Sequence, residues 1–175
     1  MNHNYYLLKL FIFLGTFTSL FFLVGILKKN GYFLVDNECL VLEVYDGDTI
    51  QVKCNDGTYK VRLIGIDTPE THKPNTPVQC YGEEATEFAK SIFTNKLVKL
   101  EKDITNKDIY DRLLRYVWIG DLITNEIIAK KGYAYLLTIP PNVKYTDTFK
   151  KAITEAQENN LGLWNDCKNV DKRAK

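Results

Sequence analysis

LVLEVYDGDTIQVKCNDGTYKVRLIGI, residues 40–66, is the stretch that determines the architecture of this chain. It contains three runs rich in β-branched and aliphatic residues, a composition that favours strands: Leu40–Val44, Thr49–Val52 and Tyr59–Ile66. Asp46-Gly47 separates the first two runs, and Asn55-Asp56-Gly57 separates the second from the third. Because such residues favour the tight turns of hairpins, the stretch predicts an antiparallel β-meander.

Helical and strand patterns alternate downstream of this meander. Between Tyr81 and Lys96 the apolar residues recur at helical spacing, with Glu83 and Glu84 in the first turn, where the helix dipole favours acidic side chains. Two further helices and two further strands are predicted: Asn125–Lys131 and Thr146–Asn160, then Leu97–Leu100 and Leu113–Ile119. Five strands with three helices favour an α+β fold, a five-stranded Greek-key β-barrel of the OB type, preceded by an N-terminal hydrophobic helix.

An almost unbroken apolar run from Tyr5 to Leu27 precedes this domain and ends at Lys28-Lys29. About 20 apolar residues suffice to cross a bilayer as a helix, and the run offers no polar face for a globular helix. Residues 1–30 are therefore interpreted as a transmembrane anchor or a cleaved signal segment. A linker over 31–38, the OB-fold domain over 39–166 and a polar tail over 167–175 follow.

The charge distribution excludes a general polycation. Three of the 23 basic residues lie within residues 1–30, which leaves 20 basic against 22 acidic residues from Gly31 onward. A chain of 175 residues suits one domain with a real core rather than two. Any hold on nucleic acid must therefore come from a few placed side chains.

Four cysteines form an even set outside the apolar segment: Cys39, Cys54, Cys80 and Cys167. Such a set is typical of disulfides in an oxidising compartment, although four scattered cysteines can equally be reduced core residues. If Asp46 and Gly47 are the central turn residues, Cys39 lies opposite Cys54, which leaves Cys80 to pair with Cys167. A bulge in either strand would shift the register and break the first pairing.

Three polar motifs interrupt the apolar runs: Asp46-Gly47-Asp48-Thr49, Arg62-Leu63-Ile64-Gly65-Ile66-Asp67-Thr68-Pro69-Glu70 and Asp108-Ile109-Tyr110-Asp111-Arg112-Leu113-Leu114-Arg115-Tyr116. Each alone has an ordinary explanation, as a good turn, as acidic loop residues or as solvated arginines. Arg62 is harder to explain in this way, because a continuous strand would place it on one face with Ile64 and Ile66. A guanidinium there is costly unless it has a partner or faces a cleft.

Four motifs, taken in order, resemble the successive signatures of the thermonuclease family, the staphylococcal nuclease type: Val44-x-Asp46-Gly47-Asp48-Thr49, Arg62-Leu63-x-Gly65-Ile66-Asp67-Thr68-Pro69-Glu70, Tyr81-Gly82-x-Glu84-Ala85 and Asp108-x-Tyr110-x-Arg112. The resemblance extends from about Cys39 to Trp164. It implies an OB-fold barrel that hydrolyses DNA and RNA with a calcium ion, usually leaving 3′-phosphate ends.

The same resemblance assigns six residues: the metal carboxylates Asp48 and Asp67, the metal-binding backbone carbonyl of Thr68, the general base Glu70, and the phosphate-binding pair Arg62 and Arg112. The chemistry agrees with these roles. Calcium prefers several oxygen ligands, and a planar guanidinium can bind two phosphate oxygens at once. A positioned carboxylate can take a proton from the attacking water.

Two features depart from the family pattern. Asp111 stands where the family usually has glycine, and its carboxylate either pairs with Arg112 and weakens the hold on phosphate or points into solvent. The loop Leu136–Pro141 is aliphatic where the family often has tyrosines that pack on the nucleotide, while Tyr133 and Tyr135 are expected in a core strand. Base stacking is therefore expected to be weak, with substrate preference resting on phosphate contacts.

The leading hypothesis is a calcium-dependent nuclease acting on DNA and/or RNA as a monomer, attached to the membrane through its N-terminal segment or secreted, with its domain outside the cytosol. A catalytically inactive OB-fold module that binds nucleic acid or protein is the alternative, because folds do not fix functions. A membrane-anchored calcium-binding structural domain would explain the carboxylates but not the two arginines. The complete set of arginines, glutamate and aspartates favours the enzyme.

Overall fold

The computed structural model describes residues 38–71 and 77–167. The apolar segment over residues 1–30 and the polar tail after Cys167 lie outside the described residues, so their interpretation stays a prediction. Within the described part of the chain, no helix is long and apolar enough to cross a membrane.

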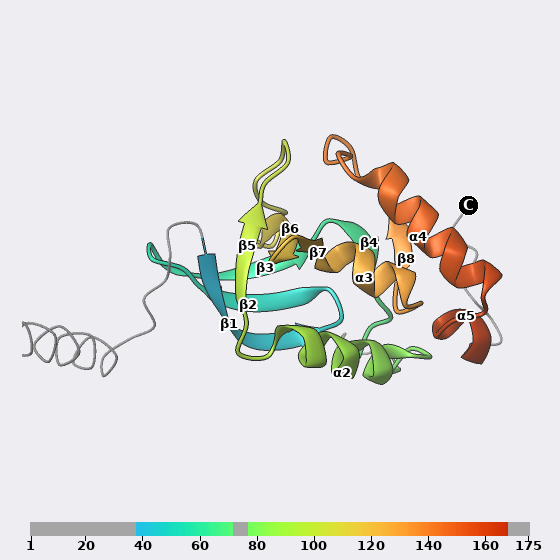
Figure 1. Cartoon of the computed structure of the whole chain (residues 1–175). Helices are drawn as coiled ribbons and strands as arrows, with labels where there is room; N and C mark the ends of the chain where they lie inside the picture. Colours follow the sequence, from blue (N-terminus) through green and yellow to red (C-terminus); the bar gives the residue numbers. More distant parts are fainter. Residues whose placement is uncertain (1–37, 72–76, 168–175) are drawn as a thin grey trace, which may run out of the picture. The chain divides into compact units, whose positions relative to one another are not determined.

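A closed β-barrel forms the centre of the domain (Figure 1). Its five strands are β1 (Glu38–Asp46), β2 (Thr49–Lys53), β3 (Thr58–Leu63), β5 (Leu97–Glu101) and β6 (Leu113–Ile119). They pair antiparallel in the order β3-β2-β1-β5-β6, and a parallel pairing of β3 with β6 closes the barrel. The predicted five-stranded OB-type barrel with its opening meander is confirmed.

Helices cover the barrel where the periodicity predicts them: α2 (Gly82–Phe93), α3 (Thr124–Lys130) and α4 (Thr146–Glu158). Shorter elements accompany them, which the sequence did not reveal: β4 (Gly65–Asp67), β7 (Leu122–Ile123), β8 (Tyr135–Leu137) and α5 (Leu163–Asp166). Strands β4 and β8 pair with each other in a separate small sheet. Segments of two to four residues are too short to show a hydrophobic period, so the sequence does not predict these elements.

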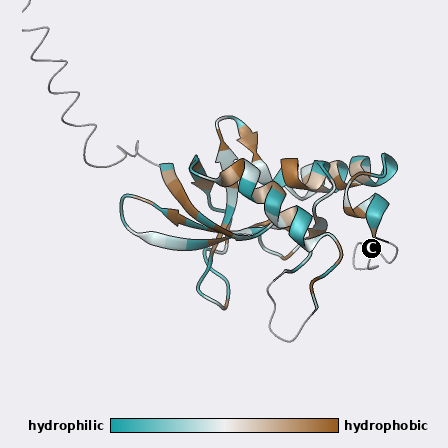
Figure 2. Cartoon of the chain, turned by 90° about the horizontal axis from the view of Figure 1, so that it is seen from below, coloured by the Kyte–Doolittle hydropathy of each residue, from teal (hydrophilic) through white to brown (hydrophobic). Residues whose placement is uncertain are grey.

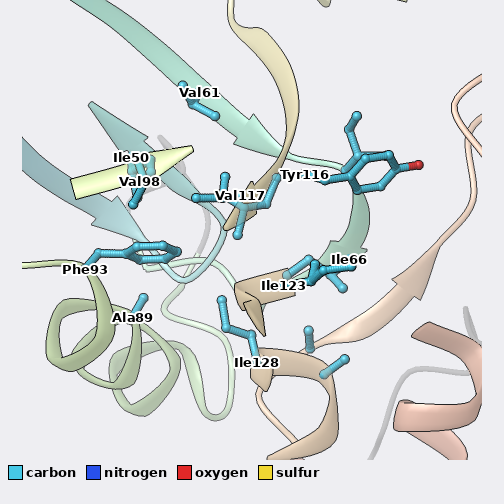
Figure 3. Close-up of a cluster of buried hydrophobic side chains, with 14 of the residues drawn as sticks. Ile50, Val61, Ile66, Ala89, Phe93, Val98, Tyr116, Val117, Ile123 and Ile128 are labelled. Atoms are coloured by element: carbon cyan, nitrogen blue, oxygen red, sulfur yellow. The ribbon is translucent and has the colours of Figure 1, made fainter. Parts of the chain in front are cut away.

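The core lies between the barrel strands and helices α2 and α3, as Figure 3 shows. Its fully buried side chains include Ile50, Val61, Ile66, Phe93, Val98, Tyr116, Val117 and Ile128. Burying one such apolar side chain stabilises the fold by roughly 1.5–3 kcal/mol. In Figure 2 the helices carry both hydrophobic and hydrophilic residues, as expected for helices with one face against a core.

The prediction of one continuous strand over Tyr59–Ile66 is wrong at its C-terminal end. Strand β3 stops at Leu63 and β4 starts at Gly65, where φ is 83°, a left-handed conformation that glycine adopts without strain. The N–H of Ile64 donates to the carbonyl of Arg115 on β6. Because the strand is interrupted, Leu63, Ile64 and Ile66 are all buried, and the expected shared face of Arg62, Ile64 and Ile66 does not form.

Both predicted disulfides are present, Cys39–Cys54 and Cys80–Cys167, with Cα–Cα distances of 4.3 and 5.9 Å. The cysteines are therefore not reduced core residues. The turn between β1 and β2 was nevertheless misplaced by one residue, because Asp46 pairs with Thr49 and the central residues are Gly47 and Asp48. Two β-bulges in β1 then shift the pairing, so that Leu40 lies opposite Lys53. In this register Cys39 comes opposite Cys54, as predicted.

Candidate active site

Five of the six predicted site residues come together at one end of the barrel. The β1–β2 turn supplies Asp48, the ends of β3 and β4 supply Arg62 and Asp67, Thr68 follows β4, and Arg112 immediately precedes β6. Antiparallel and parallel pairing around β3 place these strand ends beside one another, although up to 64 positions separate the residues in sequence.

Arg62 lies at the centre of this group, with 11% of its side chain exposed. Its Nη2 donates to Asp67 Oδ1 at 2.9 Å and forms an ion pair with Asp48 Oδ2 at 3.0 Å. Its Nη1 donates to the carbonyls of Leu63 and Ile66 at 2.6 and 2.8 Å. A buried guanidinium needs partners, and Arg62 finds them in two carboxylates and two backbone carbonyls.

Asp48 is buried and joins the turn to the segment after β4. Its Oδ2 accepts the backbone N–H of Thr68 at 2.9 Å, and its Oδ1 accepts the hydroxyl of Thr49 at 3.0 Å. Asp46 lies beside it, and its Oδ1 accepts the N–H of Asp48 at 3.0 Å. Burial and the negative charge of Asp48 raise the pKa of Asp46 to about 7.

Arg112 is held by Asp108 rather than by Asp111. Its Nε donates to Asp108 Oδ2 at 2.6 Å and its N–H donates to Asp108 Oδ1 at 3.0 Å. Burial alone would raise the pKa of Asp108, but these hydrogen bonds and the charge of Arg112 lower it. The carboxylate of Asp111 is exposed and pairs with Lys107 at 2.7 Å, so it does not compete for the guanidinium.

A polar chain connects the two arginines. Arg112 Nη1 donates to Thr49 Oγ1 at 3.5 Å, Thr49 in turn donates to Asp48, and Asp48 forms an ion pair with Arg62. Thr49 and Asp108 therefore belong to the site, although neither was predicted to have a role in it. Their positions inside two of the polar motifs were the available signal.

Glu70 is the sixth predicted residue, and its hydrogen bonds to described residues are made by its backbone and not by its carboxylate. It follows Pro69, just beyond β4, and is partly buried. Its backbone N–H donates to Gln79 Oε1 at 3.0 Å, and its carbonyl accepts the N–H of Gln79 at 3.0 Å. Among residues 38–71 and 77–167, none forms a hydrogen bond or ion pair with its carboxylate.

A cavity of about 570 Å³ opens beside both arginines. Its lining includes the polar residues Arg62, Arg112 and Asp108 and the aliphatic residues Leu137, Ile139 and Pro140. The predicted core position of the tyrosines is right in part: Tyr135 lies in β8 against Trp164, whereas Tyr133 precedes β8 and stacks on Phe88.

The carboxylates offer a partial shell for a cation. Asp48 and Asp67 converge on one guanidinium nitrogen, and the backbone of Thr68 lies within hydrogen-bond distance of Asp48. Among the described residues, no group of three or more acidic, histidine or cysteine side chains is arranged to enclose a metal. The oxygens of Asp48 and Asp67 are nevertheless donors of the kind that a hard cation binds.

Comparison with known proteins defines the class of this protein. The family model "Staphylococcal nuclease homologue" matches residues 60–166. The chain is 46% identical over 140 residues to a thermonuclease of Staphylococcus intermedius, covering 80% of this chain and 83% of that protein. It is 47% identical over 124 residues to a thermonuclease of Staphylococcus hyicus, covering 71% and 73%.

A third relative is the SPbeta prophage-derived endonuclease YokF of Bacillus subtilis (strain 168), 42% identical over 121 residues that make up 68% of this chain and 41% of that protein. These matches, together with the closed barrel and the two arginines at its site, place the protein among the nucleases. More specifically, the chain belongs to the family of staphylococcal nuclease homologues.

Proposed function

We propose that this nuclease hydrolyses phosphodiester bonds of DNA and/or RNA with calcium, using Arg62, Arg112 and Glu70. The observation that carries the proposal is the convergence of Asp48 and Asp67 on Arg62, with Arg112 connected to the same group through Thr49. One site thus offers both fixed positive charge for a phosphate and carboxylate oxygens for a hard cation.

The two arginines suit the charge of the reaction. A phosphodiester is an anion, and its transition state for hydrolysis gathers further negative charge on the phosphoryl oxygens. Guanidinium groups that are already fixed in place stabilise that charge without reorganising during the reaction. Asp108 fixes Arg112 through two hydrogen bonds, and carbonyls of the barrel fix Arg62.

Glu70 suits the role of general base. Its carboxylate has no described partner, while its backbone is held on both sides by Gln79. A base of this kind takes a proton from the water that attacks phosphorus, and such a step contributes typically 10²–10⁴-fold.

Calcium would be held by the carboxylates of Asp48 and Asp67 and by the Thr68 carbonyl. When bound, the ion supplies positive charge to the phosphate and lowers the pKa of coordinated water. These protein donors come from a hairpin turn and a strand end, so their arrangement is irregular. Calcium tolerates irregular shells of 6–8 oxygens, whereas magnesium demands near-ideal octahedral geometry.

Metal dependence tests this assignment on the purified full chain. Activity on a labelled oligonucleotide is expected in calcium, is expected to disappear in excess chelator, and is expected to be restored only poorly by magnesium. Asp48→Asn should raise the calcium concentration needed for half-maximal activity, because an amide carries no charge. Full activity in chelator would contradict the proposal.

The alternative, a catalytically inactive nucleic-acid- or protein-binding module, accounts for the arginines but not for the rest of the site. A module that only binds phosphate has no use for a glutamate such as Glu70, whose carboxylate has no partner among the described residues, or for two aspartates beside its arginine. Carboxylates at a phosphate site weaken binding by repulsion unless a cation accompanies them.

We also propose that the domain acts outside the cytosol, in a membrane-anchored or secreted form. The two disulfides support this, because disulfides persist in oxidising compartments, and so does the apolar run Tyr5–Leu27. Protease added to intact cells should degrade a C-terminally tagged chain, or the tag should be recovered in the medium. Complete protection until the cells are lysed would place the domain in the cytosol.

A further inference from the structure

Two hydrogen bonds join Glu70 to Gln79, one through the Gln79 side chain and one between backbone groups. The side-chain carbonyl of Gln79 accepts the N–H of Glu70, and the N–H of Gln79 donates back to the carbonyl of Glu70, both at 3.0 Å. Gln79 thereby satisfies both backbone polar groups of Glu70. It approaches neither Arg62 nor Arg112 through any hydrogen bond within the described residues.

Gln79 is in turn tied to the start of helix α2. Its carbonyl accepts the N–H of Gly82 at 3.0 Å. A methyl group at Gly82 would lie 2.9 Å from the carbonyl oxygen of Glu70, closer than real contacts allow, so the first turn of α2 packs directly on the backbone of Glu70. Only glycine permits this approach.

The next residue, Cys80, is bonded to Cys167 across 87 positions of sequence. Cys167 is buried, and its N–H donates to the carbonyl of Leu163 in α5. Leu163 is fully buried and donates to the carbonyl of Gly132 at 2.9 Å, just beyond α3. Cys80 is therefore fastened to the packed part of the domain, one residue away from the side chain that holds Glu70.

We propose that Gln79 is the positioning residue for Glu70 and that the Cys80–Cys167 disulfide keeps Gln79 in place, so that turnover depends on the oxidation state of this bond. The inference rests on the proposed role of Glu70. A near-attack geometry is sensitive, since a displacement of about 1 Å costs on the order of 10²-fold in rate. Loosening Gln79 thus lowers turnover without removing any catalytic group.

Reduction of the bond has a defined stoichiometry. A dithiol reductant gives two electrons and two protons to the disulfide, Cys80 and Cys167 become two thiols, and the dithiol becomes its own disulfide. In a reducing compartment Gln79 would therefore hold Glu70 less firmly. In an oxidising compartment the intact disulfide keeps both residues in place.

Substitutions at Gln79 test the positioning role. Gln79→Leu removes the acceptor at similar size, and should lower kcat roughly tenfold to a hundredfold with KM changed less than about threefold, because the phosphate contacts remain. Gln79→Glu keeps an oxygen acceptor at the same position, now a carboxylate oxygen in place of the amide oxygen, and should recover most of kcat.

The two disulfides provide a matched pair for the redox test on the full chain. Cys80→Ser/Cys167→Ser should lower kcat about as much as Gln79→Leu. Cys39→Ser/Cys54→Ser should leave kcat within about twofold, because this bond lies at the far end of β1 and β2, on the order of 15 Å from the β1–β2 turn. Dithiothreitol should lower kcat in the wild type and leave Cys80→Ser/Cys167→Ser unaffected.

Combining the variants separates positioning from a general loss of stability. If the disulfide acts through Gln79, adding Gln79→Leu to Cys80→Ser/Cys167→Ser should cost less than about twofold more. All assays are made at a temperature where circular dichroism shows each variant folded. Wild-type kcat in both Gln79→Leu and Cys80→Ser/Cys167→Ser, with Glu70→Gln inactive, would overturn this inference alone. Wild-type kcat in Glu70→Gln would instead overturn the proposed function.

Discussion

Replacing Glu70 by glutamine is expected to lower kcat for nucleic-acid hydrolysis by roughly two orders of magnitude or more, because the variant loses its general base. Glutamine has nearly the same size and keeps the backbone contacts to Gln79. The arginines remain in place, so KM should change little. Steady-state kinetics on a labelled oligonucleotide in saturating calcium measure both constants.

A neighbouring acid provides the control for this substitution. Glu84 lies in the first turn of α2 and is exposed, so Glu84→Gln removes the same charge without removing a proposed catalytic group. It should retain kcat within about threefold, as expected for a surface substitution. Equal kcat in the wild type and Glu70→Gln would show that another group accepts the proton.

Replacing Arg62 is expected to have the second largest effect. Arg62→Ala removes a phosphate contact and should lower kcat/KM by roughly a hundredfold. It also leaves Asp48 buried without its ion pair, which should destabilise the fold by up to about 3 kcal/mol. The bond to Asp67 contributes less, because 40% of the Asp67 side chain is exposed and solvent screens it.

Lysine should not rescue this position. Arg62 uses two nitrogens to reach four acceptors, the carbonyls of Leu63 and Ile66 and the carboxylates of Asp48 and Asp67. A single ammonium cannot span the same acceptors, so Arg62→Lys should stay within about tenfold of Arg62→Ala in kcat/KM.

The matched control for Arg62 is an arginine whose partners are not carboxylates. Arg115 donates to the carbonyls of Asn106 and Leu114 and to the side chain of Asn106. Arg115→Ala should change kcat/KM less than about threefold, because it lies outside the proposed phosphate site. Full activity of Arg62→Lys, or an equal loss in Arg115→Ala, would contradict the assignment.

Much of the barrel was predictable because its long strands and helices carry a clear hydrophobic period. The meander over residues 40–63 and the helix beginning near Tyr81 follow from local composition alone. The interruption at Gly65 did not, since a single glycine in an apolar run also occurs within continuous strands. The disulfide Cys39–Cys54 was predicted from a register that was wrong at the turn, and two bulges that the sequence does not show restored the pairing.

The residues of the site were predictable, but their hydrogen-bond and ion-pair partners were not. The motifs placed Asp48, Arg62, Asp67 and Arg112 in one site, and the structure brings them together. Which carboxylate would hold Arg112 depended on the turn conformation at Asp111, which has φ 64° and directs its own side chain to Lys107. Hydrogen bonds between residues 9 apart on either side of a loop, such as Glu70 to Gln79, leave no periodic signal in the sequence.

Hydrolysis of nucleic acid, and not binding alone, is the activity proposed for this site. The most direct test incubates labelled DNA and RNA oligonucleotides with the purified full chain in calcium, with Glu70→Gln as the background. We predict cleavage of at least one substrate by the wild type, abolished by chelator and reduced by about a hundredfold or more in Glu70→Gln. Binding of the oligonucleotides with no cleavage above the Glu70→Gln background would contradict the account and identify a binding module instead.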